Sequence, residues 1–288
     1  MIMKNLDLLI TGGSGFIGTH LVNSLNSIYN ITNLGRTKNP MCSNIYWDLK
    51  TGLDDVIIPP PCAVIHCASI VNSKSTDNYE YIDVNVKSTI ALLEFCIKNS
   101  VKKFIFLSSG GVYGYSKKPL SEYDSCKPEG IYLLSKYFSE KICNLYKDRL
   151  DIIILRPFFP YGEGQKGRLI SNLFYDILNN NVISLNRNGH PKINPIYISD
   201  LIDVIKLVIE NDVSGIFNAC GDDIISIEEL CNVIVQITGK KNLRFFYKET
   251  DTEDLVGDNS QLYSHLNYKL NINLEQGLTY YFNWLKGS

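Results

Sequence analysis

The segment "LDLLITGGSGFIGTHLVNSLN", residues 6–26, is the most informative part of the amino-terminal half. Its opening residues, 6–11, form a short apolar run that predicts a strand, and residues 16–26 have the apolar spacing of a helix. Three glycines occupy the junction between these two elements: Gly12, Gly15 and Gly18. Glycine permits a tight turn and a close approach of backbone to a ligand. A glycine triplet directly between a first strand and a helix therefore predicts a turn that binds the pyrophosphate of a dinucleotide.

The amides that open this helix are part of the same prediction. The first N–H groups of a helix have no partner within the helix, and the helix dipole favours an anion beside them. We expect the residues of the first turn, Phe16 and Ile17, to border the bound phosphates together with the glycines.

Strand-like and helix-like segments alternate through the first 156 residues. The strand candidates are residues 6–11, 30–34, 62–68, 102–109 and 151–157, and the helix candidates are residues 16–26, 79–99 and 130–148. Such alternation is typical of crossover units that build a parallel sheet covered on both faces. The sequence thus predicts an α/β fold, a Rossmann-type doubly wound parallel sheet.

The regularity fades after Pro157. "NRNGHPKINP" (186–195) reads as a loop, while residues 199–211, 226–240 and the closing "NLEQGLTYYFNWLKG" read as helices. We expect a dinucleotide-binding domain over residues 1–165, with segments of the later chain added to it. Residues 166–288 are expected to form a smaller α/β substrate lobe that is partly interleaved with it.

The composition excludes several functional classes. The chain has 288 residues and a net charge of −2, so it lacks the basic footprint of a nucleic-acid or anionic-membrane partner. No apolar run reaches the ~18 residues that span a bilayer. The start "MIMKNLDLLITGG" lacks the layout of a signal peptide. We expect a cytoplasmic protein.

The cysteines and histidines do not predict a metal site. The eight cysteines are scattered and form no Cys-x-x-Cys pair, and the four histidines are dispersed. Several cysteines lie in apolar runs, which indicates free thiols in a reducing compartment.

The end of the second strand candidate, "NLGRTK" (33–38), bears on the choice of cofactor. A carboxylate at this place usually binds the adenosine ribose and repels a 2′-phosphate. Here Gly35 stands in its place and Arg36 follows, and an arginine can clamp a 2′-phosphate. NADP(H) is therefore favoured and NAD(H) stays open. Asp48, with Leu49 beside it, is the candidate contact for the adenine.

The pattern Tyr-x-x-x-Lys, which can be a proton-transfer pair, occurs five times. The copies are Tyr46/Lys50, Tyr113/Lys117, Tyr123/Lys127, Tyr132/Lys136 and Tyr137/Lys141. With 18 tyrosines in the chain, chance matches are expected, so the pattern alone does not identify an acid–base residue.

Taken together, several motifs resemble those of one family. They occur in the order "TGGSGFIG", "HCAS", "NVKST", "LSSGGVYG", "YLLSK" and "RPFFPYGEGQ". In order and approximate spacing they are similar to the extended short-chain dehydrogenase/reductases, the NAD(P)-dependent nucleotide-sugar epimerases, dehydratases and ketoreductases. The resemblance is clear to about residue 165 and looser through "IYISDLIDVI". It implies a nucleotide-sugar substrate and a homodimer paired through the helices near 79–99 and 130–148.

The resemblance selects one tyrosine. In the family a Ser-x-x-x-Tyr-Gly segment ends a strand and Tyr-x-x-x-Lys lies on the next helix, which makes Ser109, Tyr132 and Lys136 the implied triad. Lys136 shares a helix face with Tyr132. Tyr137 is five residues further on, about 140° around the helix, and points elsewhere.

The chemistry requires these residue types. Hydride transfer between a carbinol carbon and nicotinamide needs a proton to leave or reach the oxygen. A free phenol has a pKa of about 10, and a nearby ammonium favours the phenolate. Lys136 would also bind the nicotinamide ribose, and Ser109 would donate a hydrogen bond to the substrate oxygen.

The resemblance also implies further contacts. Those expected at the cofactor are Ala68, Ser69, Asn85, Pro157 and Phe158, in addition to Tyr132 and Lys136. Those expected at the substrate are Ser109, Tyr113, Phe159 and Lys192. The substrate side departs from the family pattern, because Phe159 replaces the usual asparagine and Ile193, with Lys192 beside it, stands where an arginine is usual.

Three functions remain open. The favoured one is a 4-ketoreductase of a nucleotide-linked deoxyhexose, in surface-polysaccharide or deoxysugar biosynthesis. The alternatives are an NAD-dependent nucleotide-sugar 4-epimerase and a non-catalytic cofactor sensor or scaffold, which would have no need for the triad. A dehydratase is disfavoured, because Gly110 and Gly111 stand where it commonly needs an acid pair.

Overall fold

The computed structural model describes residues 6–53, 56–71, 78–240 and 243–287. It divides the chain into two units, each assembled from separate segments. Unit 1 contains the chain up to Val112, Cys126–Arg156 and Val204–Phe217, and unit 2 contains Tyr113–Ser125, Pro157–Asp203 and the chain from Asn218 onward. The candidate triad falls entirely within unit 1.

Among the described residues, seven strands form the sheet of unit 1 in the order β3-β2-β1-β4-β5-β6-β9. The strands are β1 (Asp7–Thr11), β2 (Asn30–Leu34), β3 (Ser43–Ile45), β4 (Ala63–His66), β5 (Lys103–Leu107), β6 (Asp151–Pro157) and β9 (Gly215–Ala219). Every pair from β3 to β6 is parallel. The predicted Rossmann-type doubly wound sheet is confirmed.

The strand order reverses direction at β1. From this strand the chain builds outward through β2 and β3 on one side, then returns to add β4, β5 and β6 on the other. Ligands of open parallel sheets bind outside the carboxyl ends of the strands at such a reversal. Those ends are Thr11 of β1 and His66 of β4, which are register partners.

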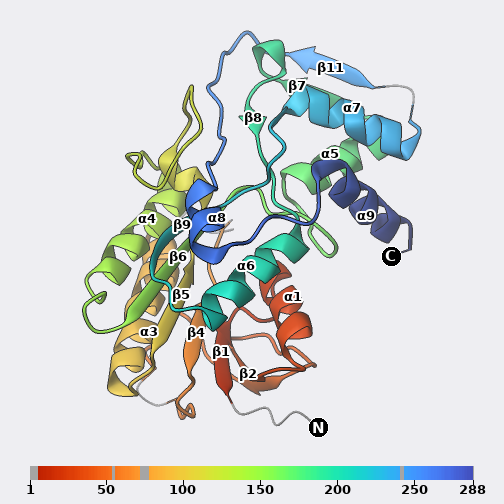
Figure 1. The fold of residues 1–288 in the computed structure, drawn as a ribbon. Coiled ribbons are helices and arrows are strands. Elements are labelled where there is room, and N and C mark those ends of the chain that lie inside the picture. Colours follow the sequence, from red (N-terminus) through yellow and green to blue (C-terminus); the bar gives the residue numbers. More distant parts are fainter. Residues whose placement is uncertain (1–5, 54–55, 72–77, 241–242, 288) are drawn as a thin grey trace. The chain divides into compact units, whose positions relative to one another are not determined.

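Helices cover both faces of this sheet (Figure 1). The helices α3 (Lys87–Lys98) and α4 (Gly130–Asn144) lie on one face, and α1 (Phe16–Leu25) lies on the other together with the second half of α6 (Ile198–Glu210). Because successive strand residues face opposite sides, the apolar runs of β5 and β6 are buried throughout.

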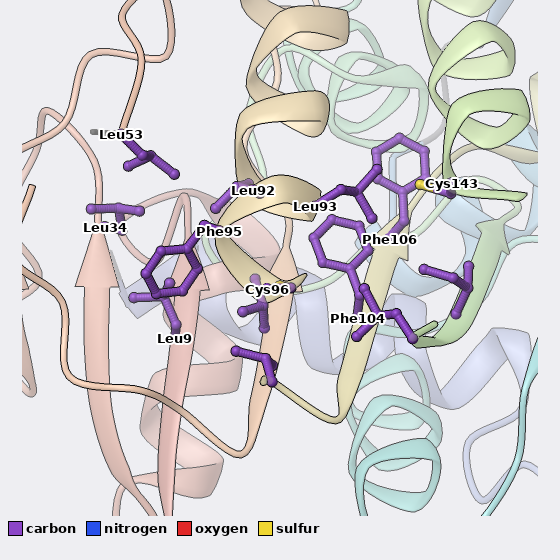
Figure 2. Packing of buried hydrophobic residues seen from close by; sticks show 14 of the residues in the cluster. Leu9, Leu34, Leu53, Leu92, Leu93, Phe95, Cys96, Phe104, Phe106 and Cys143 are labelled. Carbon is purple, nitrogen blue, oxygen red and sulfur yellow. The ribbon is translucent and has the colours of Figure 1, made fainter. Parts of the chain in front are cut away.

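Figure 2 shows the core on the α3 side of the sheet. Side chains of α3 meet side chains of three strands there: Leu92, Phe95 and Cys96 from the helix with Leu9, Leu34, Phe104 and Phe106 from β1, β2 and β5. Cys143 of α4 belongs to the same cluster. This core fixes α3 and α4 on the strands whose carboxyl ends carry the candidate site.

The predicted helix over 79–99 is interrupted. It consists of α2 (Tyr79–Tyr81), a π-helical segment (Ile82–Val86) and α3. Asn85 lies in the π segment and is buried. Single π turns within helices often occur at functional sites, and Asn85 makes the cross-links described below.

In its described residues, unit 2 consists of helices and two small sheets. Its elements are α5 (Leu169–Leu178), β7 (Val182–Leu185), β8 (Lys192–Ile193), the first turns of α6, β10 (Ile225–Ser226), α7 (Ile227–Thr238), β11 (Arg244–Tyr247), α8 (Ser260–Leu266) and α9 (Leu274–Gly287). Strand β11 pairs with β7 and β10 pairs with β8. The prediction of a loop over 186–195 was wrong at β8, because the backbone of Lys192 and Ile193 pairs with β10.

A buried ion pair joins three elements of unit 1 next to the candidate triad. The carboxylate of Glu140 accepts hydrogen bonds from Arg156 Nε at 3.0 Å and Nη2 at 2.6 Å. The hydroxyl of Ser108 donates to the same carboxylate at 2.5 Å. The pair thus ties α4 to the ends of β5 and β6, and both charged side chains are only 3% exposed.

We predict that Glu140→Ala lowers the free energy of unfolding by about 3–5 kcal/mol, because it leaves the Arg156 guanidinium buried without its carboxylate. Urea denaturation followed by circular dichroism measures the change. The control is Lys87→Ala, which breaks the exposed Lys87–Asp83 pair and should cost less than about 1 kcal/mol. Equal losses in the two variants would show that the buried pair has no special role.

Candidate active site

The glycine turn is shaped by a close approach of the backbone to itself. A Cβ at Gly18 would lie 2.1 Å from the carbonyl oxygen of Gly12, so the first turn of α1 packs directly on the end of β1. Gly12 has a φ of +69°, which favours glycine, and Gly15 is the N-cap of α1. No side chain caps the helix. Phe16 and Ile17 form its first turn, so the arrangement fits a pyrophosphate bound by amides.

The β1 turn also lies against the segment that follows β4. A Cβ at Gly12 would be 2.9 Å from the backbone of Ala68. The Ala68 amide donates to Thr11 Oγ1 at 3.2 Å, and that hydroxyl lies 2.7 Å from His66 Nδ1. Ala68 therefore lies beside the glycine turn, where the resemblance implies the cofactor path, and Ser69 is the next residue along the chain.

Burial keeps His66 neutral. Desolvation, reinforced by the charge of Lys136, holds the pKa of its imidazole well below the usual value. Its two ring nitrogens lie near hydroxyl groups, Nδ1 at 2.7 Å from Thr11 Oγ1 and Nε2 at 3.5 Å from Ser88 Oγ. His66 supports the turn and is not poised to titrate near neutral pH.

The sequence reasoning missed an asparagine network behind the turn. The Gly13 amide donates to Asn33 Oδ1 at 2.8 Å, and Asn39 Nδ2 donates to the Gly13 carbonyl at 2.7 Å. Asn33 also donates to Asn44 Oδ1 at 2.9 Å. The side-chain amides of Asn33 and Asn39 both belong to the stretch "NITNLGRTKN". Its local pattern does not indicate that they form hydrogen bonds with Gly13.

At the end of β2, the position where a ribose-binding carboxylate would stand is occupied by Gly35, and the space beside this glycine is free of close neighbours. A Cβ at Gly35 would meet no atom closer than 3.9 Å, and Arg36 and Lys38 are exposed. Asp48 lies nearby in the chain, after β3, and one of its carboxylate oxygens accepts from the Lys50 amide at 3.0 Å.

Lys136 is the buried cation of the implied triad. Its side chain is 2% exposed, and Nζ donates to the carbonyl oxygen of Leu107 at 2.6 Å and lies 4.6 Å from the centroid of the Phe106 ring. Burial lowers its pKa to about 8, an effect that the nearby Glu140 carboxylate partly offsets. The ammonium thus keeps its proton at pH 7 and is held at the carboxyl end of β5.

Ser109 follows directly in the segment after β5. Its Oγ accepts a hydrogen bond from the Gly111 amide at 3.1 Å, within a short 3₁₀ turn (Gly110–Tyr113). The side chain is partly exposed. The hydroxyl proton is therefore available for a substrate oxygen while the turn fixes the position of the oxygen atom.

Tyr132 lies in the first turn of α4, one turn before Lys136. Its carbonyl oxygen accepts from Ser135 Oγ at 2.7 Å, and Ser135 Oγ in turn accepts from Asn85 Nδ2 at 2.9 Å. Asn85 also binds both the amide and the carbonyl of Ile70. Asn85 thus joins the segment after β4 to the turn that carries Tyr132, a cross-link within the protein at a residue expected near the cofactor.

The other copies of Tyr-x-x-x-Lys lie in different surroundings. Lys141 Nζ lies 4.8 Å from the centroid of the Tyr137 ring. Tyr46 is 70% exposed and Tyr123 is 85% exposed. Tyr113 is buried in unit 2, where its Oη donates to Asn218 Oδ1 at 2.8 Å. Only the copy at Tyr132 places its lysine at the carboxyl end of a central strand.

Four further predicted contacts belong to unit 2. Phe158 is buried, stacks on Tyr113 and donates its amide to Ala219. Pro157 is buried, Phe159 is partly buried with a φ of +44°, and Lys192 is exposed. A positive φ is unusual for a phenylalanine and is a form of backbone strain often found at functional sites.

Among the described residues, no cluster of three or more His, Cys, Asp or Glu side chains could hold a metal ion. The eight cysteines are free. No helix in the described ranges is long and apolar enough to cross a bilayer.

Comparison with known proteins identifies the family. The model of the NAD dependent epimerase/dehydratase family matches residues 8–220. The chain is 27% identical to dTDP-4-dehydro-6-deoxyglucose reductase of Escherichia coli, covering 94% of this chain and 95% of that one. It is 26% identical to "Uncharacterized UDP-glucose epimerase YtcB" of Bacillus subtilis, with coverage of 95% and 96%.

Solved structures agree. UDP-glucuronic acid 4-epimerase from Bacillus cereus, crystallised with NAD, superposes with a TM-score of 0.86 at 25% identity, covering 98% of this chain and 99% of that one. The chain therefore belongs to the NAD-dependent epimerase/dehydratase family and is an NAD(P)-dependent enzyme of the extended short-chain dehydrogenase/reductase type.

Proposed function

We propose that this enzyme is an NADPH-dependent 4-ketoreductase of a nucleotide-linked deoxyhexose, in surface-polysaccharide or deoxysugar biosynthesis. The observation that carries the proposal is the end of β2, where Gly35 replaces a carboxylate and Arg36 and Lys38 are exposed. Cations at this place suit the 2′-phosphate of NADPH. An enzyme that binds NADPH typically consumes this cofactor as a reductant.

The residues of unit 1 fit such a dinucleotide. The glycine turn, with the amides of Phe16 and Ile17, would hold the pyrophosphate, and Asp48 and Leu49 would border the adenine. Ala68 and Ser69 would line the part of the site that holds the pyrophosphate and the ribose of the cofactor. A Cβ at Gly12 or Gly18 would clash with the protein's own backbone, so glycine at both positions lets β1 and α1 pack closely enough for the amides of the turn to face one ligand.

The triad would carry out the proton transfer that accompanies hydride transfer. A bound nicotinamide would supply the hydride that the carbonyl carbon accepts. Tyr132 would donate its phenolic proton to the carbonyl oxygen, and Ser109 would donate a hydrogen bond to the same oxygen as negative charge develops. Lys136 would stabilise the phenolate form of Tyr132 and bind the nicotinamide ribose.

The remaining contacts are proposed from the family resemblance. Pro157 and Phe158 would border the carboxamide, and Tyr113, Phe159 and Lys192 would contact the sugar nucleotide. The burial of Tyr113 and its hydrogen bond to Asn218 favour a packing contact over a polar one. The cytoplasmic location expected from the sequence and the homodimer expected from the resemblance stay predictions.

A nucleotide-sugar 4-epimerase is the second candidate. The relative from Bacillus cereus is named as such an epimerase and was crystallised with NAD. The same triad would serve, with the cofactor reduced and reoxidised within one turnover. Dehydration has less support, because Gly110 and Gly111 provide no acid beside Ser109.

We predict that NADPH binds about tenfold or more tightly than NADH, the effect of a charge-assisted contact from Arg36. Arg36→Ala should remove this difference, and Arg149→Ala, which also loses an exposed arginine, should preserve it. Calorimetric titration with both cofactors measures the two affinities. Equal affinities in the wild type would refute the role of Arg36.

We predict that Tyr132→Phe lowers kcat by about 10²–10⁴-fold, the range for a general acid, while the affinity for the cofactor persists. Tyr137→Phe is the matched control and should retain nearly full activity. Steady-state rates and cofactor titrations of both variants test the assignment, which the opposite pattern would overturn.

We predict that a nucleotide-linked 4-keto-6-deoxyhexose consumes one NADPH for each product formed. Absorbance of the reduced nicotinamide, followed together with product by chromatography, measures the ratio. Product formed without loss of NADPH would show an epimerase instead.

A further inference from the structure

The buried ammonium of Lys136 has no carboxylate among its described contacts. Its hydrogen bond goes to the carbonyl oxygen of Leu107. A lysine buried this deeply, at 2% exposure, tends to lose its proton unless an opposite charge lies nearby. Lys136 therefore depends on a negative charge that acts on it without a direct hydrogen bond.

The groups around Lys136 differ in whether they are ionised. Besides the proposed acid, Tyr132, the described titratable groups there are His66, Cys67, Glu140 and Cys143. His66 stays neutral because burial lowers the pKa of its imidazole. Burial raises the pKa of the Cys67 thiol to about 12 and also raises that of Cys143, so neither thiol is ionised near pH 7. Among the described residues, Glu140 is therefore the negative charge that acts on the ammonium.

Glu140 is held in place on the face of α4 that carries Lys136. It follows Lys136 by four residues, and residues at this spacing are neighbours on a helix. Arg156 and Ser108 both donate hydrogen bonds to its carboxylate. Ser108 adjoins Leu107, whose carbonyl oxygen binds Lys136. Because Glu140 is only 3% exposed, little water lies near its carboxylate to screen its charge.

We propose that Glu140 is a positioning residue of the reaction, whose fixed negative charge keeps Lys136 protonated. The ammonium is then present to stabilise the phenolate form of Tyr132. Arg156 takes part by fixing the carboxylate. This inference rests on the proposed roles of Lys136 and Tyr132, and it adds a residue that acts only through them.

The test measures the protonation of Lys136 directly, through the ¹³C shift of its Cε as the pH is raised in protein labelled with ¹³C-lysine. Lys136→Met identifies the resonance. The midpoint should lie at about pH 8 in the wild type. It should fall by about one pH unit or more in Glu140→Gln, the size expected when a nearby opposite charge is removed. Glu140→Asp, which keeps the charge, should restore most of the wild-type value.

Two control variants separate the charge of Glu140 from its packing. Ser108→Ala removes a hydrogen bond to the carboxylate but keeps its charge, and Glu94→Gln removes an exposed carboxylate on α3. Both should keep the midpoint close to the wild-type value. Should Glu140→Gln fail to fold because Arg156 has lost its carboxylate, the double variant Glu140→Gln/Arg156→Gln removes both charges. Its midpoint should also lie below that of the wild type.

The consequence for the reaction is a shift of its pH profile. Ketoreduction needs the proton that the Tyr132–Lys136 pair holds, so its rate should decline at high pH. In Glu140→Gln this decline should move to lower pH. A decline that stays at the wild-type pH would overturn the role of Glu140 in the reaction.

The outcomes separate this inference from the proposed function. A midpoint that falls in Glu140→Gln but not in Ser108→Ala supports the inference even if NADPH is not consumed. A midpoint that Glu140→Gln leaves unchanged, or that Ser108→Ala lowers equally, contradicts the inference even if ketoreduction is demonstrated.

Discussion

The candidate active site depends on a buried ammonium with a single backbone partner in the described contacts. Lys136 Nζ donates to the carbonyl oxygen of Leu107 at 2.6 Å, at the last residue of β5. Burial of a charge is costly unless hydrogen bonds compensate it, so this contact fixes the register of α4 on the sheet. Ser109 lies two residues beyond Leu107, and Tyr132 lies one helical turn before Lys136. The same contact therefore positions all three members of the triad.

Other contacts of unit 1 also hold α4 and α1 in place on the sheet. The Glu140–Arg156 pair joins α4 to β5 and β6 one turn further along the helix, and Asn85 joins the start of α4 to the segment after β4. On the cofactor side, the contact of Gly18 with Gly12 holds α1 against β1. These links lie along the carboxyl edge of the sheet, the edge at which open parallel sheets bind ligands.

Much of unit 1 could be predicted from the sequence, because parallel strands buried on both faces are continuous apolar runs. The candidates at 30–34 and 151–157 coincide with β2 and β6. Helix α5 was missed although Ile170, Leu173, Phe174 and Ile177 carry its period. The asparagine network behind Gly13 joins residues twenty or more positions apart, and no local sequence pattern indicates such contacts.

Joint action of Tyr132 and Lys136 at the nicotinamide underlies the proposed chemistry, and a crystal structure of the enzyme with dinucleotide and substrate bound would show it. We expect the Tyr132 hydroxyl beside the reacting end of the nicotinamide ring, within hydrogen-bond reach of the substrate oxygen, and Lys136 in contact with the adjoining ribose. A Tyr132 hydroxyl facing away from that ring would refute the proposed role of the pair.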